Sequence, residues 1–446
     1  MSSSRSTSVV HIVGAGLAGS EAAHYLAERG IEVVIHEMRP VKNTEAHKTD
    51  GCAELVCSNS LKSKAPTSAP GMLKAEMTEV GSLVLKSAAA TTVPGGEALA
   101  VDRDAFSAAI TQALRSHPKI RFEGGEITEP FKDGITLFAT GPLTSEALSA
   151  WLARATGGGD DLYFYDAIAP IIDASTVDRD RSFIANRYDK GEEEAYLNCP
   201  MNEEEYNAFI DALIAGEKVP PKAFEKEKFF QGCQPIEAIA ATGRESLRFG
   251  PMKPVGLTDP KTGKRAHAVV QLRPENRALT AYNMVGFQTK LKYGEQGRIF
   301  KLIPALHKAE FLRMGSIHRN TYVCGPKVLR SDLSLKGHPS VYLAGQVTGV
   351  EGYLESAACG MLAAIFIEQR VRGLAHAAPP AHTALGALLR HITSSDPKHY
   401  QPANIHFGLF DPNYFDGVVG LKRDDARTLM AEQAKRNFIR WWDGGN

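Results

Sequence analysis

The segment Ser8-Val-Val-His-Ile-Val-Gly14-Ala-Gly-Leu-Ala-Gly19 is the strongest indication of the fold in this sequence. Its β-branched apolar run before Gly14 predicts a strand, and the segment 20–29 that follows predicts a helix. Gly30 is a typical helix stop, and Ile31-Glu-Val-Val-Ile-His-Glu37 predicts a second parallel strand that ends in an acid. Strand, tight turn, helix and strand in this order predict an α/β protein with a doubly wound, Rossmann-type sheet.

The three glycines and the acid of this unit each have a physical role in binding a dinucleotide. Gly14 permits the tight turn, Gly16 lets backbone N–H groups reach a pyrophosphate, and Gly19 lets the helix pack closely on the strand. The helix dipole favours the phosphate charge, and Glu37 can accept hydrogen bonds from the adenosine ribose. The predicted cofactor-binding residues here are Gly14, Ala15, Gly16, Leu17, Ala18, Gly19 and Glu37.

A late segment favours FAD over a nicotinamide dinucleotide. Val341-Tyr-Leu-Ala-Gly345-Gln346 reads as a strand that closes on glycine, and a helix is expected from about 353 to 372. In FAD enzymes of this broad class, such a unit holds the ribityl chain and directs a helix N-terminus at the flavin pyrimidine. Gln346 stands where an aspartate is usual, and its amide can still bind a ribityl hydroxyl. Gly345 and Gln346 are therefore predicted to bind the cofactor.

The positions of these segments predict a discontinuous nucleotide domain. We expect residues 1–165 and 325–446 to form the FAD-binding domain and residues 166–324 to form a smaller inserted α/β domain. No second GxGxxG string occurs between residues 150 and 330, so a nicotinamide reductant would have no Rossmann domain of its own.

Composition describes an ordinary globular protein of enzyme size. Hydrophobic residues make up 43% and charged residues 23% of the 446 positions. Lys plus Arg and Asp plus Glu both number 51, so no global field attracts nucleic acid and an RNA site must be a local patch. The polar start and the absence of a run of about 18 apolar residues predict a cytoplasmic protein without membrane spans. No cluster has metal-ligand spacing, so no metal is expected.

Two of the six cysteines, Cys52 and Cys57, leave an alternative function open. Their CxxxxC spacing resembles the redox pair of the dithiol flavoprotein reductases. Those enzymes also carry several glycines before the first cysteine and a separate NAD domain in mid-chain, whereas here Thr49-Asp50-Gly51 precedes Cys52 and no second dinucleotide fingerprint occurs. A dithiol or NAD(P)H oxidoreductase is therefore the weaker hypothesis, and an RNA-binding flavoprotein without turnover is a third.

Cys233 is a candidate nucleophile. It lies beside Gly232 and close to Pro235 and Glu237, a setting typical of an exposed turn. A thiolate adds readily to a polarised double bond when its neighbours lower its pKa. A small buried cysteine would fit the same pattern, so the residues alone leave both interpretations open.

Several longer strings, read together, resemble the folate- and FAD-dependent tRNA uracil-5-methyltransferase family from about residue 9 to 370. They include Gly14-Ala-Gly-Leu-Ala-Gly-Ser-Glu-Ala-Ala23, Ala53-Glu-Leu-Val-Cys-Ser-Asn-Ser-Leu61, Phe249-Gly-Pro-Met-Lys-Pro-Val-Gly-Leu257 and Ala344-Gly-Gln-Val-Thr-Gly-Val-Glu-Gly-Tyr353.

The resemblance implies methylation of a T-loop uridine in tRNA, with ribosomal RNA as an alternative target. The carbon would come from 5,10-methylenetetrahydrofolate, and the electrons from NADPH or NADH through FAD. Carried across by motif, Cys233 adds to uracil C6, so that C5 can attack the folate-derived methylene group. Cys57 would assist removal of the C5 proton near the flavin.

Partners are expected to be RNA and small molecules, with no obligate protein partner evident. Local basic stretches are candidates for phosphate contacts. They comprise Lys290, Lys292, Arg298 and Lys301, with His318 and Arg319 nearby in sequence.

Overall fold

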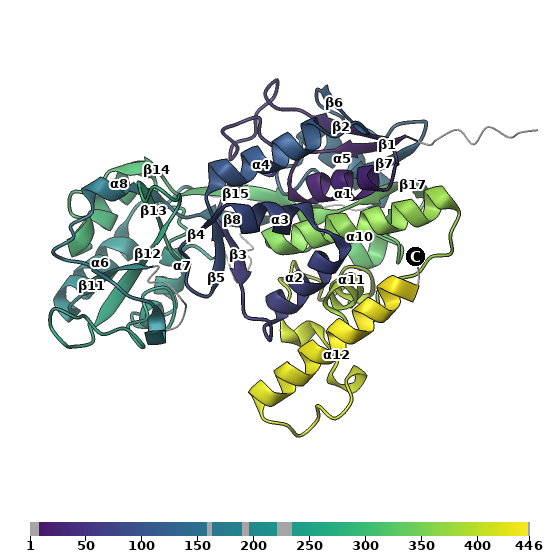
Figure 1. Cartoon of the computed structure of the whole chain (residues 1–446). Coiled ribbons are helices and arrows are strands. Elements are labelled where there is room, and N and C mark those ends of the chain that lie inside the picture. The colour runs from purple at the N-terminus through teal and green to yellow at the C-terminus, as the bar shows by residue number, and fades with distance from the viewer. Residues whose placement is uncertain (1–8, 158–162, 190–195, 221–233, 445–446) are drawn as a thin grey trace, which may run out of the picture.

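The computed structural model describes residues 9–157, 163–189, 196–220 and 234–444, except for the side chains of 163–168 and 317–319. One of two six-stranded sheets among these residues has the order β16-β17-β7-β1-β2-β6 (Figure 1), in which β16 pairs antiparallel with β17 and the other neighbours are parallel. The strands are β16 (Ser334–Leu335), β17 (His338–Leu343), β7 (Ile135–Phe138), β1 (Val10–Val13), β2 (Val33–Glu37) and β6 (Ile120–Gly124). Strands from both ends of the sequence thus share one sheet, and the predicted doubly wound Rossmann-type fold is confirmed.

Helices α1 (Leu17–Glu28) and α10 (Tyr353–Arg372) pack side by side on this sheet (Figure 1). The contact is close: a Cβ added to Gly360 would lie 2.1 Å from the carbonyl oxygen of Ala18. The expected helix from 353 to 372 is confirmed at both ends. This contact fixes the late α10 against the first turn of the nucleotide unit, so the two sequence segments that carry the fingerprint motifs meet.

The remaining elements of this body surround the sheet and its edges. They are α2 (Ala69–Val80), α3 (Leu83–Ala90), α4 (Arg103–Arg115), α5 (Glu146–Thr156), α9 (Gly325–Val328), α11 (Ala384–Ser394), α12 (Arg423–Gly444) and a small sheet of β3 (Ser60–Ser63), β5 (Ala98–Val101) and β4 (Thr92–Val93). Near the end of α12, Trp442 packs 6.5 Å from the ring of Tyr25 on α1. The C-terminal aromatic residues therefore dock on the body.

The inserted lobe is a second mixed structure with its own core (Figure 1). Its antiparallel sheet has the order β10-β11-β12-β13-β9-β14. The elements are β9 (Ile171–Asp173), β10 (Phe183–Ile184), β11 (Leu197–Met201), α6 (Glu203–Ala215), α7 (Ile236–Ala241), β12 (Ala268–Pro274), β13 (Ala281–Met284), α8 (Tyr293–Ile299) and β14 (Phe311–Arg313). Strands β8 (Tyr163–Ile168) and β15 (Ser316–Thr321) pair antiparallel in a separate two-stranded ribbon. The smaller α/β lobe is present, and its sheet is antiparallel.

Within the described residues, no helix combines the length and the apolar composition that a membrane crossing requires. No disulfide joins the five cysteines that the structure describes.

Candidate cofactor and active site

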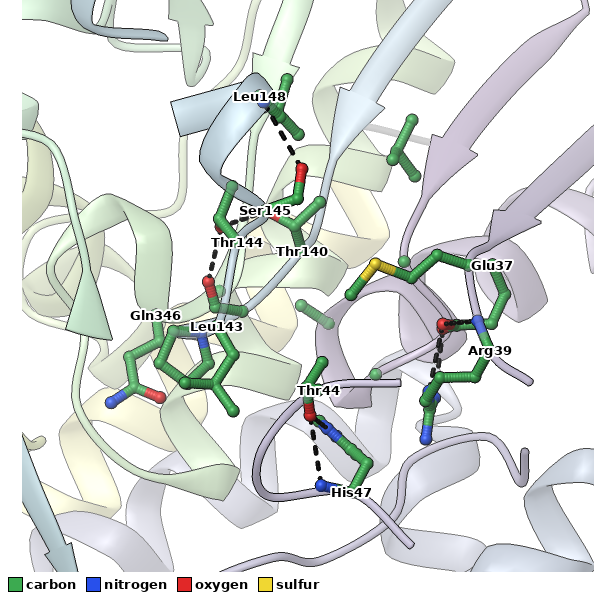
Figure 2. Close-up of a pocket in the computed structure, with 18 of the residues that line it drawn as sticks. Glu37, Arg39, Thr44, His47, Thr140, Leu143, Thr144, Ser145, Leu148 and Gln346 are labelled. Carbon is green, nitrogen blue, oxygen red and sulfur yellow. Dashed lines mark hydrogen bonds and ion pairs between the residues drawn. The ribbon is translucent and has the colours of Figure 1, made fainter. Parts of the chain in front are cut away.

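A deep cleft opens at the carboxyl ends of β1, β2 and β7, the edge at which open α/β sheets bind ligands (Figure 2). It holds about 1030 Å³ of empty space, including solvent at its mouth. Among the predicted site residues, those that line it are Gly14, Gly16, Leu17, Ala18, Glu37, Gly345 and Gln346. The turn of the first unit and the start of α10 therefore face one space.

The glycines of the first turn have the geometry that their spacing predicts. Gly14 has φ +103°, and a Cβ there would lie 2.6 Å from the carbonyl oxygen of Ala139. A Cβ on Gly19 would lie 1.9 Å from the carbonyl oxygen of Gly14, so helix and strand leave no room for a side chain. A Cβ on Gly16 would instead meet no atom within 4 Å, although Gly16 lines the cleft. The open space over Gly16, at the N-terminus of α1, fits a pyrophosphate.

Glu37 ends β2 beside this turn and is held by the protein itself. Its Oε2 accepts from the backbone N–H of Ala15 at 2.9 Å, and its Oε1 accepts from the backbone N–H and Nε of Arg39 at 3.0 Å each. Burial raises the pKa of Glu37, but these hydrogen bonds outweigh it and hold the pKa below its ordinary value. The carboxylate is therefore ionised and held in one orientation by the protein.

Arg39 is a residue of this site that the sequence reasoning missed. Its side chain is only 3% exposed, and it bridges Glu37 and Glu54 (Figure 2 shows its approach to Glu37). Its signal was the string Glu37-Met-Arg-Pro40, which places an arginine two residues after the acid that ends β2. Ala15 contributes its N–H to Glu37 without lining the cleft.

The late glycine segment closes the other side of the cleft. Gly345 has φ +79°, and a Cβ there would lie 2.9 Å from the Cβ of Ala18. Gln346 donates from Nε2 to Oε2 of Glu351 at 2.6 Å, which fixes the side-chain amide. Its carbonyl oxygen and its second N–H remain available to a hydroxyl group. Helix α10 begins at Tyr353, which also lines the cleft.

Cys57 does not line the cleft itself, but it follows the lining residue Val56 in the loop before β3 and is half-buried. Its backbone N–H donates to the hydroxyl of Tyr353 at 2.6 Å, and its carbonyl accepts from Nη2 of Arg103 at 3.2 Å. Burial raises the pKa of the Tyr353 phenol, so the hydroxyl is neutral and can accept these bonds. The loop that carries Cys57 is thus tied to the start of α10 and to the start of α4.

Cys52 does not support a dithiol pair with Cys57. Its side chain is 1% exposed, and burial raises the pKa of its thiol. A buried thiol with a raised pKa is a poor nucleophile in thiol–disulfide exchange. The oxidoreductase alternative is therefore not favoured.

The other candidate catalytic cysteine, Cys233, lies outside the described residues.

The basic residues predicted to contact RNA lie on the inserted lobe. Lys292 pairs with Glu217 at 2.6 Å, Arg298 pairs with Glu295 at 2.6 Å, and Lys301 is exposed. The side chains of His318 and Arg319 are not among those described.

Comparison with known proteins decides the family. The chain matches a family model described as glucose inhibited division protein A over residues 9–375. It is 52% identical over 435 residues to a methylenetetrahydrofolate–tRNA-(uracil-5-)-methyltransferase TrmFO from Geobacter sulfurreducens, covering 98% of this chain and 99% of that relative. The chain belongs to the methylenetetrahydrofolate–tRNA-(uracil-5-)-methyltransferase family. A relative of the same description from Bacillus cytotoxicus is 51% identical over 433 residues, covering 97% and 99% of the two chains. The resemblance seen in the sequence strings is confirmed.

A solved structure of GidA from Aquifex aeolicus supports the fold. It superposes with a TM-score of 0.68 at 16% identity, covering 97% of this chain and 76% of that one. At this identity the likeness concerns architecture alone.

Proposed function

We propose that this protein methylates C5 of a T-loop uridine in tRNA, taking carbon from 5,10-methylenetetrahydrofolate and electrons from NADPH or NADH through bound FAD. The observation that carries the proposal is the near full-length identity of about half its residues with relatives described as methylenetetrahydrofolate–tRNA-(uracil-5-)-methyltransferases. The same chemistry on ribosomal RNA is the alternative.

The cleft supports FAD as the cofactor. The ADP half would lie over Gly16, with its pyrophosphate at the N-terminus of α1 and its ribose near Glu37. Gly14, Ala15, Leu17, Ala18 and Gly19 would shape that turn, and Gly345 and Gln346 would contact the ribityl side. When bound, the flavin supplies the redox chemistry that a folate-derived methylene needs to become a methyl group.

The protein's own residues would supply nucleophilic and proton-transfer chemistry. The Cys233 thiolate would form a bond to uracil C6, which moves the C5–C6 electron pair toward the O4 carbonyl and makes C5 nucleophilic. After C5 has gained its carbon substituent, Cys57 would help to remove the C5 proton, and loss of the thiol from C6 would restore the ring. We retain the division into an FAD-binding domain of residues 1–165 and 325–446 and an inserted domain of 166–324 as part of the proposal.

RNA contacts would come from the inserted lobe. Lys301 is exposed near the end of α8, and Lys292 and Arg298 form pairs on the surface that a phosphate can replace at small cost. We propose these residues, with Lys290, His318 and Arg319, as the candidate phosphate contacts.

A single assay tests the function. Purified protein is incubated with NADPH, methylenetetrahydrofolate labelled in the methylene carbon, and an unmodified tRNA transcript. Label is expected in the RNA, at the T-loop uridine. A transcript with cytidine at that position is the matched control and should stay unlabelled. Label that enters only a ribosomal RNA fragment would favour the alternative target, and NADPH oxidation with no label in either RNA would contradict the proposal.

A further inference from the structure

Arg103, the first residue of α4, makes several hydrogen bonds to the loop that carries Cys57. Its Nη1 donates to the carbonyl of Leu55 at 2.6 Å and its Nη2 donates to the carbonyl of Cys57 at 3.2 Å. The same Nη2 of Arg103 donates to Oε1 of Glu275 at 3.1 Å. The Nε of Arg103 forms an ion pair with Oε2 of Glu275. One guanidinium therefore holds two carbonyls of the loop and one carboxylate.

Glu275 belongs to the inserted lobe, where it directly follows β12, so this ion pair crosses between the two lobes. Both side chains are withdrawn from solvent: that of Arg103 is 14% exposed and that of Glu275 is 6% exposed. Next to the pair, the buried Asn59 donates to the carbonyl of Pro274 at 2.8 Å and accepts from Nε of Arg273 at 2.9 Å. The loop of Cys57 is thus fastened to the end of β12 by several polar contacts.

Among the described residues, three elements bring ionisable side chains near Cys57. Arg103 on α4, Arg313 on β14 and the phenol of Tyr353 on α10 each interact electrostatically with Cys57. Burial lowers the pKa of Arg103, but Glu275 and then Tyr353 and Cys57 raise it above its ordinary value. Arg103 therefore stays charged, and a cation that contacts the carbonyl of Cys57 favours the thiolate form of that residue.

We infer that Arg103 and Glu275 are positioning residues for Cys57: the arginine holds the loop and favours the thiolate, and the glutamate of the inserted lobe holds the arginine in place and moderates its charge. The inference rests on the proposed function only for the role of Cys57 in methylation. It makes the reactivity of a thiol in one lobe depend on an ion pair that the other lobe completes.

The test measures Cys57 directly. Full-length flavin-bound protein is alkylated with iodoacetamide across a range of pH, and peptide mass spectrometry reports the rate at Cys57 alone. The midpoint of the pH profile gives the thiol pKa, separately from accessibility. Arg103→Met should raise that midpoint by about one unit, so that alkylation well below it slows about tenfold. Glu275→Gln should shift the midpoint in the opposite direction, because it leaves the arginine charge uncompensated.

Arg277→Met is the matched control. Arg277 also spans the two lobes, donating to the carbonyls of Ala90 and Thr92 at 2.7 and 2.9 Å, but among the described residues no hydrogen bond or ion pair joins it to the Cys57 loop. It should leave the midpoint unchanged. If Arg103→Met alone does not fold, the double variant Arg103→Met with Glu275→Gln is compared with Glu275→Gln alone. Both proteins lack the glutamate charge, so they differ only in the arginine charge. The midpoint should be higher in the double variant.

Shifts of the same sign in Arg103→Met and Glu275→Gln, or no shift on removing Arg103 in either background, would overturn the inference. Alkylation requires neither RNA nor folate, so the result stands whether or not tRNA methylation is observed. With a functional assay in hand, Arg103→Lys should retain the midpoint, because the charge remains, yet lower kcat with little change in KM for tRNA, because a single ammonium cannot hold both carbonyls.

Discussion

The hydroxyl of Tyr353 accepts a hydrogen bond from the backbone N–H of Cys57 at 2.6 Å, although 296 residues separate them in the sequence. The same hydroxyl accepts from the N–H of Ser58 at 3.2 Å. Two backbone donors of an irregular loop therefore depend on one side chain at the start of α10. The late helix thus positions the early thiol as well as one wall of the cleft.

Tyr353→Phe should loosen this loop. The substitution preserves the ring and removes the acceptor of two partly buried N–H groups, which costs about 1–3 kcal/mol of local stability. We expect faster amide hydrogen exchange in the peptide that contains Cys57 and Ser58, with flavin still bound. Tyr414→Phe, which changes a half-exposed tyrosine elsewhere, is the control and should leave that peptide unchanged. Unaltered exchange in Tyr353→Phe would mean that the contact does not hold the loop.

The sequence predicted those features of the fold that depend on residues close together in the chain. The helix Tyr353–Arg372 and the turn at Gly14 follow from apolar periodicity and from glycine spacing, both of which act within about 20 residues. The pair of Arg103 with Glu275 could not be predicted in this way, because the partners are 172 positions apart in the sequence and lie at a helix start and in an irregular segment. Such pairs depend on how the two lobes pack against each other, and that packing cannot be predicted from any single segment of the sequence.

Gly16→Val should give protein without flavin. Gly16 has φ −71°, a conformation that any residue adopts, and a Cβ there clashes with no protein atom. The added side chain would instead occupy the space that a pyrophosphate needs, so a loss of FAD would report a clash with the ligand and not backbone strain. We expect flavin occupancy to fall by at least about tenfold, measured from the visible absorbance per protein.

Gly294→Val is the matched control for this change. Gly294 lies in α8, and a Cβ there also meets no atom within 4 Å. The variant should keep its flavin. Retention of flavin in Gly16→Val, with unchanged thermal stability, would show that the cofactor does not pass over this glycine.

Glu21 should make the folded state sensitive to pH. It is buried in α1 and accepts from the backbone N–H of Val84 at the start of α3 at 2.9 Å. Burial raises its pKa from 4.5 to about 7, against the weaker effect of its hydrogen bonds. Because the folded pKa is the higher one, its contribution to stability is complete below about pH 4.5 and is lost as the pH rises through about 7. The difference corresponds to about 3 kcal/mol.

Glu21→Gln keeps an acceptor for Val84 but cannot ionise. Its Tm relative to the wild type should therefore be higher at pH 8 than at pH 5. Glu79→Gln, an exposed change on α2, should show no such trend. A constant Tm difference between Glu21→Gln and wild type over this range would show that Glu21 keeps one protonation state throughout.

The roles of Cys233 and Cys57 predict different phenotypes. Cys233→Ala should retain FAD and its reduction by NADPH but lose methyl transfer by at least about a hundredfold, because no thiolate remains to add to uracil C6. A tRNA containing 5-fluorouracil tests this covalently: fluorine at C5 cannot leave as a proton, so the thioether at C6 should persist as a protein–RNA adduct. Peptide mass analysis should locate the RNA on Cys233, and Cys324→Ala should form the adduct as the wild type does. An adduct on Cys57 and none on Cys233 would reverse the two assignments.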